Sequence, residues 1–171
     1  AKQGLSGAPN RALGKEGLLK LIHDIGFVQV DSIATVERAH HQILFSRNQT
    51  YRREHLTALL EDDRDLFEHW THDASIIPSS FFRYWKHRFK WEGETIVERW
   101  KAWRGEGFEK GCDDTYQRIA EGGPVLARDL KEAEHQSGGW WNWHPSKTAL
   151  EVLWRTGKLA IARRENFQKV Y

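Results

Sequence analysis

The order of helical and extended segments near the C-terminus is the feature that most restricts how this chain can fold. Apolar residues at helical spacing, separated by glycine and proline breakers, predict three helices there. These helices are expected over residues 113–121, 127–135 and 145–156. Two short strands should follow, Lys158–Ala162 and Phe167–Tyr171, on either side of Arg163–Asn166. Three helices followed by a β-hairpin is the order of a winged helix, a variant of the helix-turn-helix.

The N-terminal part of the chain has a related order. Helices are expected over residues 14–25, 35–47 and 51–60, an extended segment over 27–33, and strands over 66–70 and 74–78. The hairpin would form a first wing, and the aromatic and basic residues 79–103 predict two connecting helices. The predicted fold class is therefore mainly α with short β-hairpins (α+β), built as tandem winged-helix domains joined by a helical linker. The predicted domains are residues 1–78 and 112–171, with residues 79–111 as the linker.

Composition excludes several classes of protein. Nine Trp and eight Phe among 171 residues are too many aromatic side chains for a disordered chain. The single cysteine, Cys112, excludes an internal disulfide and a thiolate metal cluster. His69 and His72 lack the further ligands that a metal site needs, and no nucleotide-binding loop is present, so we expect no metal and no cofactor. Without a long apolar segment or a signal sequence, the chain is expected to be cytoplasmic.

Positive charge is concentrated at the C-terminus. The whole chain has a net charge of +2, but residues 140–171 carry +4 and the rest −2. In the last predicted helix Lys147 and Arg155 lie on the face opposite the apolar stripe, and Arg163 and Arg164 are expected at the tip of the hairpin. Such cations could follow a DNA backbone, or they could form an ordinary solvated face. The aromatic run Trp140–Trp143 could stack on bases or lock the helix to its domain.

Gln29 and Asp31 form the candidate catalytic pair. On an extended segment residues i and i+2 point the same way, with side chains about 7 Å apart, so one water could lie between them. Asp31 could accept the proton of that water or stabilise positive charge on a sugar, while Gln29 orients the oxygen. The alternative is a half-buried strand with a polar face, in which Asp31 and Ser32 cap the helix that follows.

Several motifs together resemble a known family. They are Gln29–Ile33, Glu37–His40, Leu44–Arg47, Glu68–Trp70, His72–Ser75 with Pro78, Gly123–Pro124, Ala127–Asp129, Gly139–Trp143 and Arg163–Gln168. In this order and spacing they resemble the bacterial winged-helix DNA glycosylases of the YcaQ/AlkZ type, the crosslink-repair DNA glycosylases. The resemblance covers nearly the whole chain.

The resemblance implies a monofunctional DNA glycosylase that removes alkylated purines, including N7-linked lesions and interstrand crosslinks, from double-stranded DNA. It implies that a Gln-x-Gln or Gln-x-Asp motif is catalytic, here Gln29 and Asp31 of the Gln-x-Asp subtype. Arg38, His40 and Arg47 are then candidates for steering the DNA backbone, with ion pairs at the edge of the core as the alternative. A monomer that acts on the nucleoid in base excision repair is the expected form.

The chain differs from the family pattern in two respects, and one alternative function is open. Family members are longer and carry a further winged helix and a barrel-like part, so this chain is expected to be an N-terminal fragment with weaker DNA binding. Leu126 stands where a hydroxyl cap would be usual before the helix that starts at Ala127. A non-catalytic winged-helix DNA-binding protein, such as a transcriptional regulator, is the alternative to a glycosylase.

Overall fold

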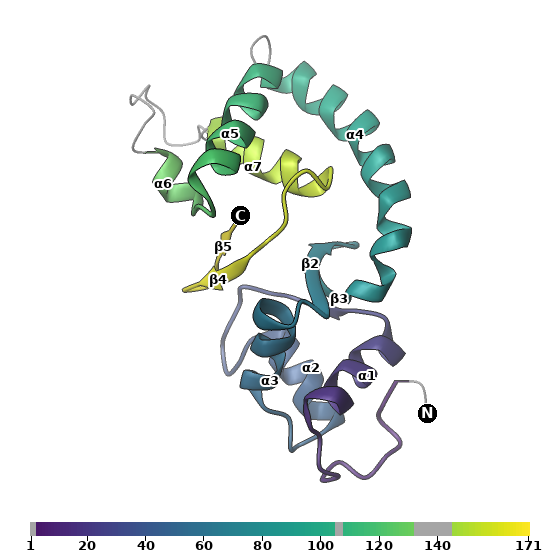
Figure 1. Cartoon of the computed structure of the whole chain (residues 1–171). Coiled ribbons are helices and arrows are strands. Elements are labelled where there is room, and N and C mark those ends of the chain that lie inside the picture. Colours follow the sequence, from purple (N-terminus) through teal and green to yellow (C-terminus); the bar gives the residue numbers. More distant parts are fainter. Residues whose placement is uncertain (1–2, 105–107, 132–144) are drawn as a thin grey trace. The chain divides into compact units, whose positions relative to one another are not determined.

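The computed structural model describes residues 3–104, 108–131 and 145–171 and divides into two units, residues 1–83 and 84–171 (Figure 1). Each unit combines α-helices with one small antiparallel sheet. The chain is therefore mainly helical and of the α+β class, as predicted.

The first helix of the first unit, α1 (Lys15–Ile25), confirms the prediction for residues 14–25. Its completely buried residues, Leu18 and Ile22, are one turn apart and face the core. Gly26 ends the helix with φ 91° and donates its N–H to the carbonyl of Ile22 at 2.9 Å. This left-handed conformation favours glycine because a Cβ would be strained there.

A three-stranded antiparallel sheet follows, with the order β1-β3-β2. Its strands are β1 (Val28–Gln29), β2 (Leu66–Trp70) and β3 (Ala74–Pro78), and β2 and β3 form the predicted hairpin. Figure 1 shows the helices of this unit below the sheet. The extended segment is shorter than predicted. After Val30 the pairing stops, because Asp31 Oδ1 accepts the N–H of Ile33 at 2.8 Å and turns the chain.

The second helix, α2 (Ala39–Arg47), begins four residues later than predicted. Arg38 is its N-cap residue, and its carbonyl accepts the N–H groups of His41 and Gln42. The carboxylate of Glu37 accepts the N–H of Arg38 at 2.8 Å, which stabilises the extended conformation before the helix. The third helix, α3 (Arg53–Thr57), continues into a π-helical turn, η1 (Ala58–Asp62).

The second unit is mostly helical. After a 3₁₀ turn, η2 (Ser79–Phe81), come α4 (Phe82–Arg104), α5 (Phe108–Gly122), α6 (Ala127–Lys131) and α7 (Pro145–Arg155). Helix α4 is a single helix, so the prediction of two helices over residues 79–103 is wrong. Gly93 lies in the middle of α4, where glycine costs more conformational entropy than other residues. The helix still forms there because most of its stability comes from packing against the core.

The core of this unit lies where α4, α5 and α7 meet. Ile96 of α4, Cys112 of α5 and Leu153 of α7 are each 8% exposed or less. The inward stripe that the sequence predicts for α7 is confirmed, since its four residues are at most 2% exposed. They are Ala149, Leu150, Leu153 and Trp154. The start of α6 is also secured, because Asp129 Oδ2 accepts the N–H of Leu126 at 3.0 Å in place of a hydroxyl cap.

The C-terminal hairpin is confirmed, but its strands and turn differ from the prediction. The strands are β4 (Arg163–Glu165) and β5 (Gln168–Val170), and residues 158–162 are irregular. Asn166 and Phe167 form the two-residue turn with φ 46° and 67°. Both positive φ values are typical of a type I′ turn, which matches the right-handed twist of the strands. Arg163 and Arg164 therefore belong to a strand and not to the tip.

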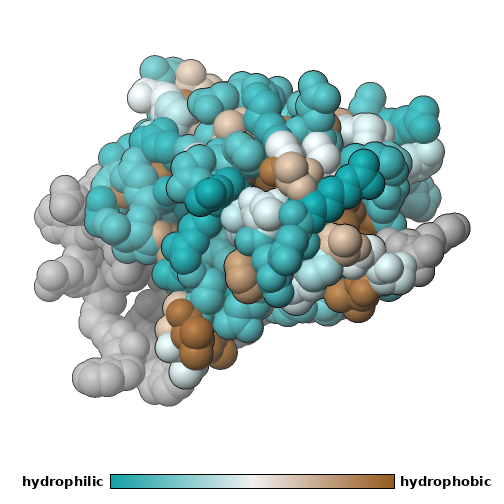
Figure 2. Space-filling view, turned by 90° about the horizontal axis from the view of Figure 1, so that it is seen from below, coloured by the Kyte–Doolittle hydropathy of each residue, from teal (hydrophilic) through white to brown (hydrophobic). Residues whose placement is uncertain are grey.

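The described surface is largely polar. Figure 2 shows a face on which hydrophilic residues predominate and hydrophobic residues form small, separate patches. None of the helices in the described ranges has the length and apolar character needed to cross a bilayer.

Candidate active site

Gln29 and Asp31 lie on the same face of the β1 segment, as the alternation predicts. Val28 and Val30 are 1% and 5% exposed and point into the core, whereas Gln29 and Asp31 are partly exposed. The N–H of Val30 donates to the carbonyl of Ala74 at 2.8 Å, which continues the pairing with β3 by one residue. The pair therefore sits at the end of the sheet, where solvent can reach it.

Pairing with β3 brings a third polar side chain to this face. Gln29 pairs with Ser75, and Asp73 lies two residues before Ser75, in the turn between β2 and β3. Gln29 Nε2 donates a hydrogen bond to Asp73 Oδ2 at 3.3 Å. In the sequence, Asp73 lies within the family motif His72–Ser75 but was not predicted as a site residue. The register of the β2–β3 hairpin with β1 is the signal that would have found it.

The remaining acceptor atoms of the pair are available for a substrate. Asp31 Oδ1 accepts the N–H of Ile33, but none of the described residues donates to Asp31 Oδ2 or to Gln29 Oε1. Two oxygen acceptors from neighbouring positions on one face can bind the hydrogens of one water. A carboxylate can also stabilise positive charge that develops on a nearby sugar ring.

The loop after Asp31 is fixed by charged side chains. Arg38 Nη1 donates to the carbonyl of Ser32 at 2.6 Å, and Glu37 forms an ion pair with Arg53. The N–H of Arg38, which donates to Glu37, is the main cause of the lowered pKa of that carboxyl, and Arg53 lowers the pKa further. The same loop includes Val36, whose side chain is 91% exposed. This segment is thus held in place while it exposes an apolar side chain in the loop that follows Asp31.

His40 and Arg47 lie on α2 and have structural surroundings. His40 is 7% exposed and its ring contacts that of His41 in a tilted arrangement, with 4.2 Å between centroids. Arg47 Nη1 donates to the carbonyl of Ile43 at 2.9 Å. Burial lowers the pKa of His41 and raises that of Tyr51, whose hydroxyl oxygen lies 2.7 Å from His41 Nδ1.

The predicted C-terminal cations lie in different surroundings. Arg155 contacts the buried carboxylate of Glu92, whose side chain is 1% exposed. Arg163 forms an ion pair with Glu165 across 2.5 Å. Arg164 donates to the carbonyl of Phe167 at 2.7 Å and its guanidinium lies over that ring. Lys147, in the first turn of α7, is exposed.

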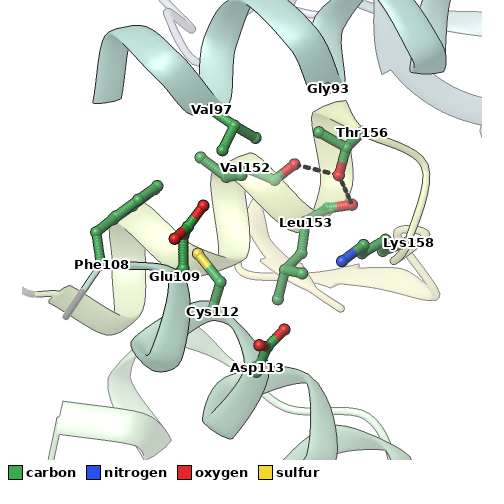
Figure 3. A pocket seen from close by; sticks show the side chains of 10 residues that line it. All are labelled: Gly93, Val97, Phe108, Glu109, Cys112, Asp113, Val152, Leu153, Thr156 and Lys158. Carbon is green, nitrogen blue, oxygen red and sulfur yellow. Dashed lines mark hydrogen bonds between the residues drawn. The ribbon is translucent and has the colours of Figure 1, made fainter. Parts of the chain in front are cut away.

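A cavity of about 470 Å³ lies between α4, α5 and α7 in the second unit (Figure 3). Its walls are both apolar and polar, with Glu109, Asp113 and Lys158 among its lining residues. Burial raises the pKa of the Cys112 thiol to about 11, so the thiol in this cavity is protonated near neutral pH and is a poor nucleophile. None of the residues predicted for catalysis or DNA binding lines this cavity.

The aromatic run and the possible metal ligands were also considered in the sequence. The aromatic run Trp140–Trp143 lies outside the described residues. Within residues 3–104, 108–131 and 145–171, no group of three or more His, Cys, Asp or Glu side chains is arranged to hold a metal ion.

Comparison with known proteins agrees with the sequence motifs. No solved structure matches the chain. The family model described as DNA glycosylase AlkZ-like matches residues 22–171, which include the sheet, the candidate pair and all the helices after α1. The match leaves out only the first 21 residues. The chain therefore belongs to the AlkZ-like DNA glycosylase family.

Proposed function

We propose that this chain carries the catalytic residues of a monofunctional DNA glycosylase that acts on alkylated purines in double-stranded DNA, including N7-linked lesions and interstrand crosslinks. One observation supports the proposal in a chain that belongs to a DNA glycosylase family. Gln29 and Asp31 share the partly exposed face at the end of a sheet, and one side-chain oxygen of each has no donor among the described residues. The pair is of the Gln-x-Asp subtype.

The proposed reaction is hydrolysis of the N-glycosidic bond. Alkylation at N7 makes a purine cationic, so the bond between C1′ and N9 breaks with its electron pair moving to the base. Asp31 stabilises the positive charge that develops on the sugar and accepts a proton from the attacking water. Gln29 accepts a hydrogen bond from that water through Oε1 and directs its oxygen to C1′. No lysine nucleophile is needed, because the products are a free base and an abasic site.

The site is compatible with a bulky base. A base linked to the opposite strand cannot rotate fully into a closed pocket, as small lesions do. Gln29 and Asp31 lie at an open sheet end and not inside the 470 Å³ cavity, which is built from other residues. Attack on the sugar from outside a pocket suits the removal of crosslinked purines.

We also propose that each unit is a winged helix. Three helices with a three-stranded antiparallel sheet support this for the first unit, and helices followed by the β4–β5 hairpin support it for the second. The division into residues 1–78, 79–111 and 112–171 stays a prediction. Because α4 packs in the core of the second unit, the helix of the predicted linker belongs structurally with that unit.

Among the predicted DNA-binding residues, we propose that Arg38, Lys147, Arg163 and Arg164 contact phosphates. Ammonium and guanidinium groups bind phosphate oxygens through charge-assisted hydrogen bonds, and arginine can do so with two parallel bonds. His40, Arg47 and Arg155 are proposed to act mainly by supporting the fold around these contacts. A monomer located in the cytoplasm at the nucleoid remains the predicted state of the protein.

Release of N7-methylguanine from a duplex tests the proposed function. Single-turnover rates are measured with the chain in excess over a duplex that contains the lesion. Asp31→Asn is expected to lower the rate by about 100-fold or more, because it removes the negative charge and the proton acceptor. Duplex affinity should remain nearly unchanged, since neither shape nor the phosphate contacts change.

Asp24→Asn is a matched control, because Asp24 is an exposed carboxylate of the same unit that pairs with Lys20. Its rate should equal that of the unmodified chain. Absence of base release by the chain, or an Asp31→Asn variant with full activity, would contradict the proposal. Sequence-selective binding without any base release would instead indicate a non-catalytic winged-helix protein such as a transcriptional regulator.

A further inference from the structure

The carboxylate of Asp73 is held in a fixed orientation beside Gln29. Its Oδ1 accepts the N–H of Ala74 at 2.7 Å, and its Oδ2 accepts the hydrogen bond from Gln29 Nε2 at 3.3 Å. The two oxygens therefore have different partners, one in the backbone of β3 and one in the candidate catalytic pair.

The backbone at Asp73 is also fixed. Its carbonyl accepts hydrogen bonds from the N–H of Thr71 at 2.9 Å and from the hydroxyls of Thr71 and Ser75, each at 3.2 Å. The two hydroxyls lie 2.9 Å apart and contact each other. These hydrogen bonds to the backbone carbonyl close the β2–β3 hairpin. Oδ2 of Asp73 takes no part in them and contacts Gln29 instead.

The chemistry of the two groups determines which way the amide of Gln29 points. An ionised carboxylate can only accept hydrogen bonds, whereas a side-chain amide has a donor end and an acceptor end. Beside Asp73, the donor end Nε2 must face the carboxylate, so Oε1 faces away from it. A neutral partner with its own N–H would hold the amide the other way round.

The orientation of the amide matters for the proposed reaction. Oε1 can accept a hydrogen bond from the attacking water, which leaves the lone pairs of the water oxygen free to attack C1′. If the NH₂ group of Gln29 faced the water, it would donate a hydrogen bond to the water oxygen and occupy one of these lone pairs. Only the first orientation assists nucleophilic attack by the water.

We propose that Asp73 is a positioning residue, which fixes the amide of Gln29 so that Oε1 points to the water of the glycosylase reaction. This inference rests on the proposed function, since it assigns Asp73 a role through Gln29. It goes beyond the Gln-x-Asp pair, because it adds a third residue from a different strand and gives it a defined action.

Asp73→Asn tests the proposal with little change in shape. The amide oxygen of the introduced asparagine can keep the bond from Ala74 N–H, so its NH₂ group turns to Gln29, whose Oε1 then rotates toward it. The single-turnover rate of N7-methylguanine release should fall by about 10- to 100-fold, with the duplex dissociation constant unchanged. A rate within about twofold of the unmodified chain would overturn the proposal.

A compensating double variant separates positioning from a structural role. When Gln29→Glu is combined with Asp73→Asn, the NH₂ group of the asparagine donates to one oxygen of the new glutamate, and the other oxygen again accepts from the water. The double variant should release base at least about tenfold faster than Asp73→Asn alone. Gln29→Glu alone should be slow, because two carboxylates then face each other. A double variant no faster than the slower single variant would overturn the proposal.

A direct measurement covers the case in which Asp73→Asn weakens the fold. In the unmodified chain, the Nε2 protons of Gln29 should show nuclear Overhauser contacts with the β protons of Asp73, and these contacts should disappear in Asp73→Asn. Their absence in the unmodified chain would overturn the proposal. If Asp31→Asn abolishes release while Asp73→Asn does not, only the role of Asp73 fails. If Asp31→Asn and Gln29→Ala both retain full activity, the proposed function itself fails.

Discussion

Arg155 Nη2 lies 3.1 Å from both carboxylate oxygens of Glu92, which joins α7 to α4 inside the second unit. Arg88, one turn before Glu92, contacts the same carboxylate at 3.3 Å. Glu92 is 1% exposed, whereas the side chains of Arg88 and Arg155 are 30% and 20% exposed. A buried acid is therefore neutralised by two cations whose outer ends reach solvent. Arg155 was predicted from sequence as a DNA contact, and this pairing gives it a structural task.

Glu92→Ala should destabilise the second unit strongly, because it leaves two partly buried guanidinium groups without their anion. Breaking a fully buried ion pair costs about 3–5 kcal/mol. Since both arginines are partly exposed, a loss of about 2–3 kcal/mol is expected. Urea unfolding measures this loss. Glu94→Ala, at an exposed position on the same helix, should change stability by less than about 0.5 kcal/mol.

Gly157→Ala should also destabilise the second unit. Gly157 has φ 75°, and a Cβ there would lie 2.5 Å from the ring of Phe89. Strain and overlap together should cost at least about 1–2 kcal/mol. Gly111→Ala is the matched control. Gly111 lies within α5 and a Cβ would meet nothing within 4 Å, so alanine should stabilise by about 0.5–1 kcal/mol. Equal effects of the two changes on the melting temperature would contradict this packing.

The stability of the first unit should fall as the pH is lowered through the range below about 6.5. Burial, followed by the nearby Arg53, lowers the pKa of His41 in the folded state, so the unfolded state binds the proton more readily. The stabilising contribution is complete above the ordinary histidine pKa and is lost as the pH drops through the folded-state value. Thermal unfolding between pH 8 and pH 5 measures this.

His41→Gln provides the comparison for this pH dependence, since glutamine does not titrate and can still contact the hydroxyl of Tyr51. The decrease in melting temperature between pH 7 and pH 5 should be smaller in this variant. An unchanged pH profile would show that His41 does not cause the effect.

Lys147→Gln should weaken binding to any duplex without changing the lesion preference. Lys147 is exposed in the first turn of α7, where the helix dipole also favours a phosphate. Loss of one phosphate contact should reduce the slope of log affinity against log salt by about 0.9. Lys110→Gln is the control, because Lys110 is an exposed lysine on a different helix, α5, and is not among the predicted DNA contacts. If both variants change the slope equally, Lys147 has no specific role.

Val36→Ser should weaken binding of damaged duplex while leaving the fold intact. Val36 is 91% exposed in the loop that follows Asp31, and exposed apolar side chains can contact or separate bases. Replacing it should cost about 1 kcal/mol of binding, or roughly fivefold in affinity. Fluorescence anisotropy with a lesion-containing duplex measures the loss. Val36 contributes little to the core, so an unchanged dissociation constant at unchanged stability would show that this loop does not reach DNA.

Local signals in the sequence were sufficient for several elements. The apolar spacing of α1 with Gly26 after it, and the two β-rich segments that became β2 and β3, were predicted because each depends on neighbouring residues alone. The buried stripe of α7 follows from periodicity for the same reason. The predicted start of α2 was wrong, whereas its end at Arg47 was right, because the carboxylate of Glu37 accepts the N–H of Arg38 and competes with helix formation there.

By itself, then, the sequence determined the fold class, the family motifs and the shared face of Gln29 and Asp31, since these depend on spacing along one segment. Only the tertiary structure decided that Asp73 lies beside Gln29 and that Arg155 neutralises Glu92, across 44 and 63 residues. Such contacts depend on strand register and helix packing, which bring together residues whose separation along the chain contains no information about their distance in space.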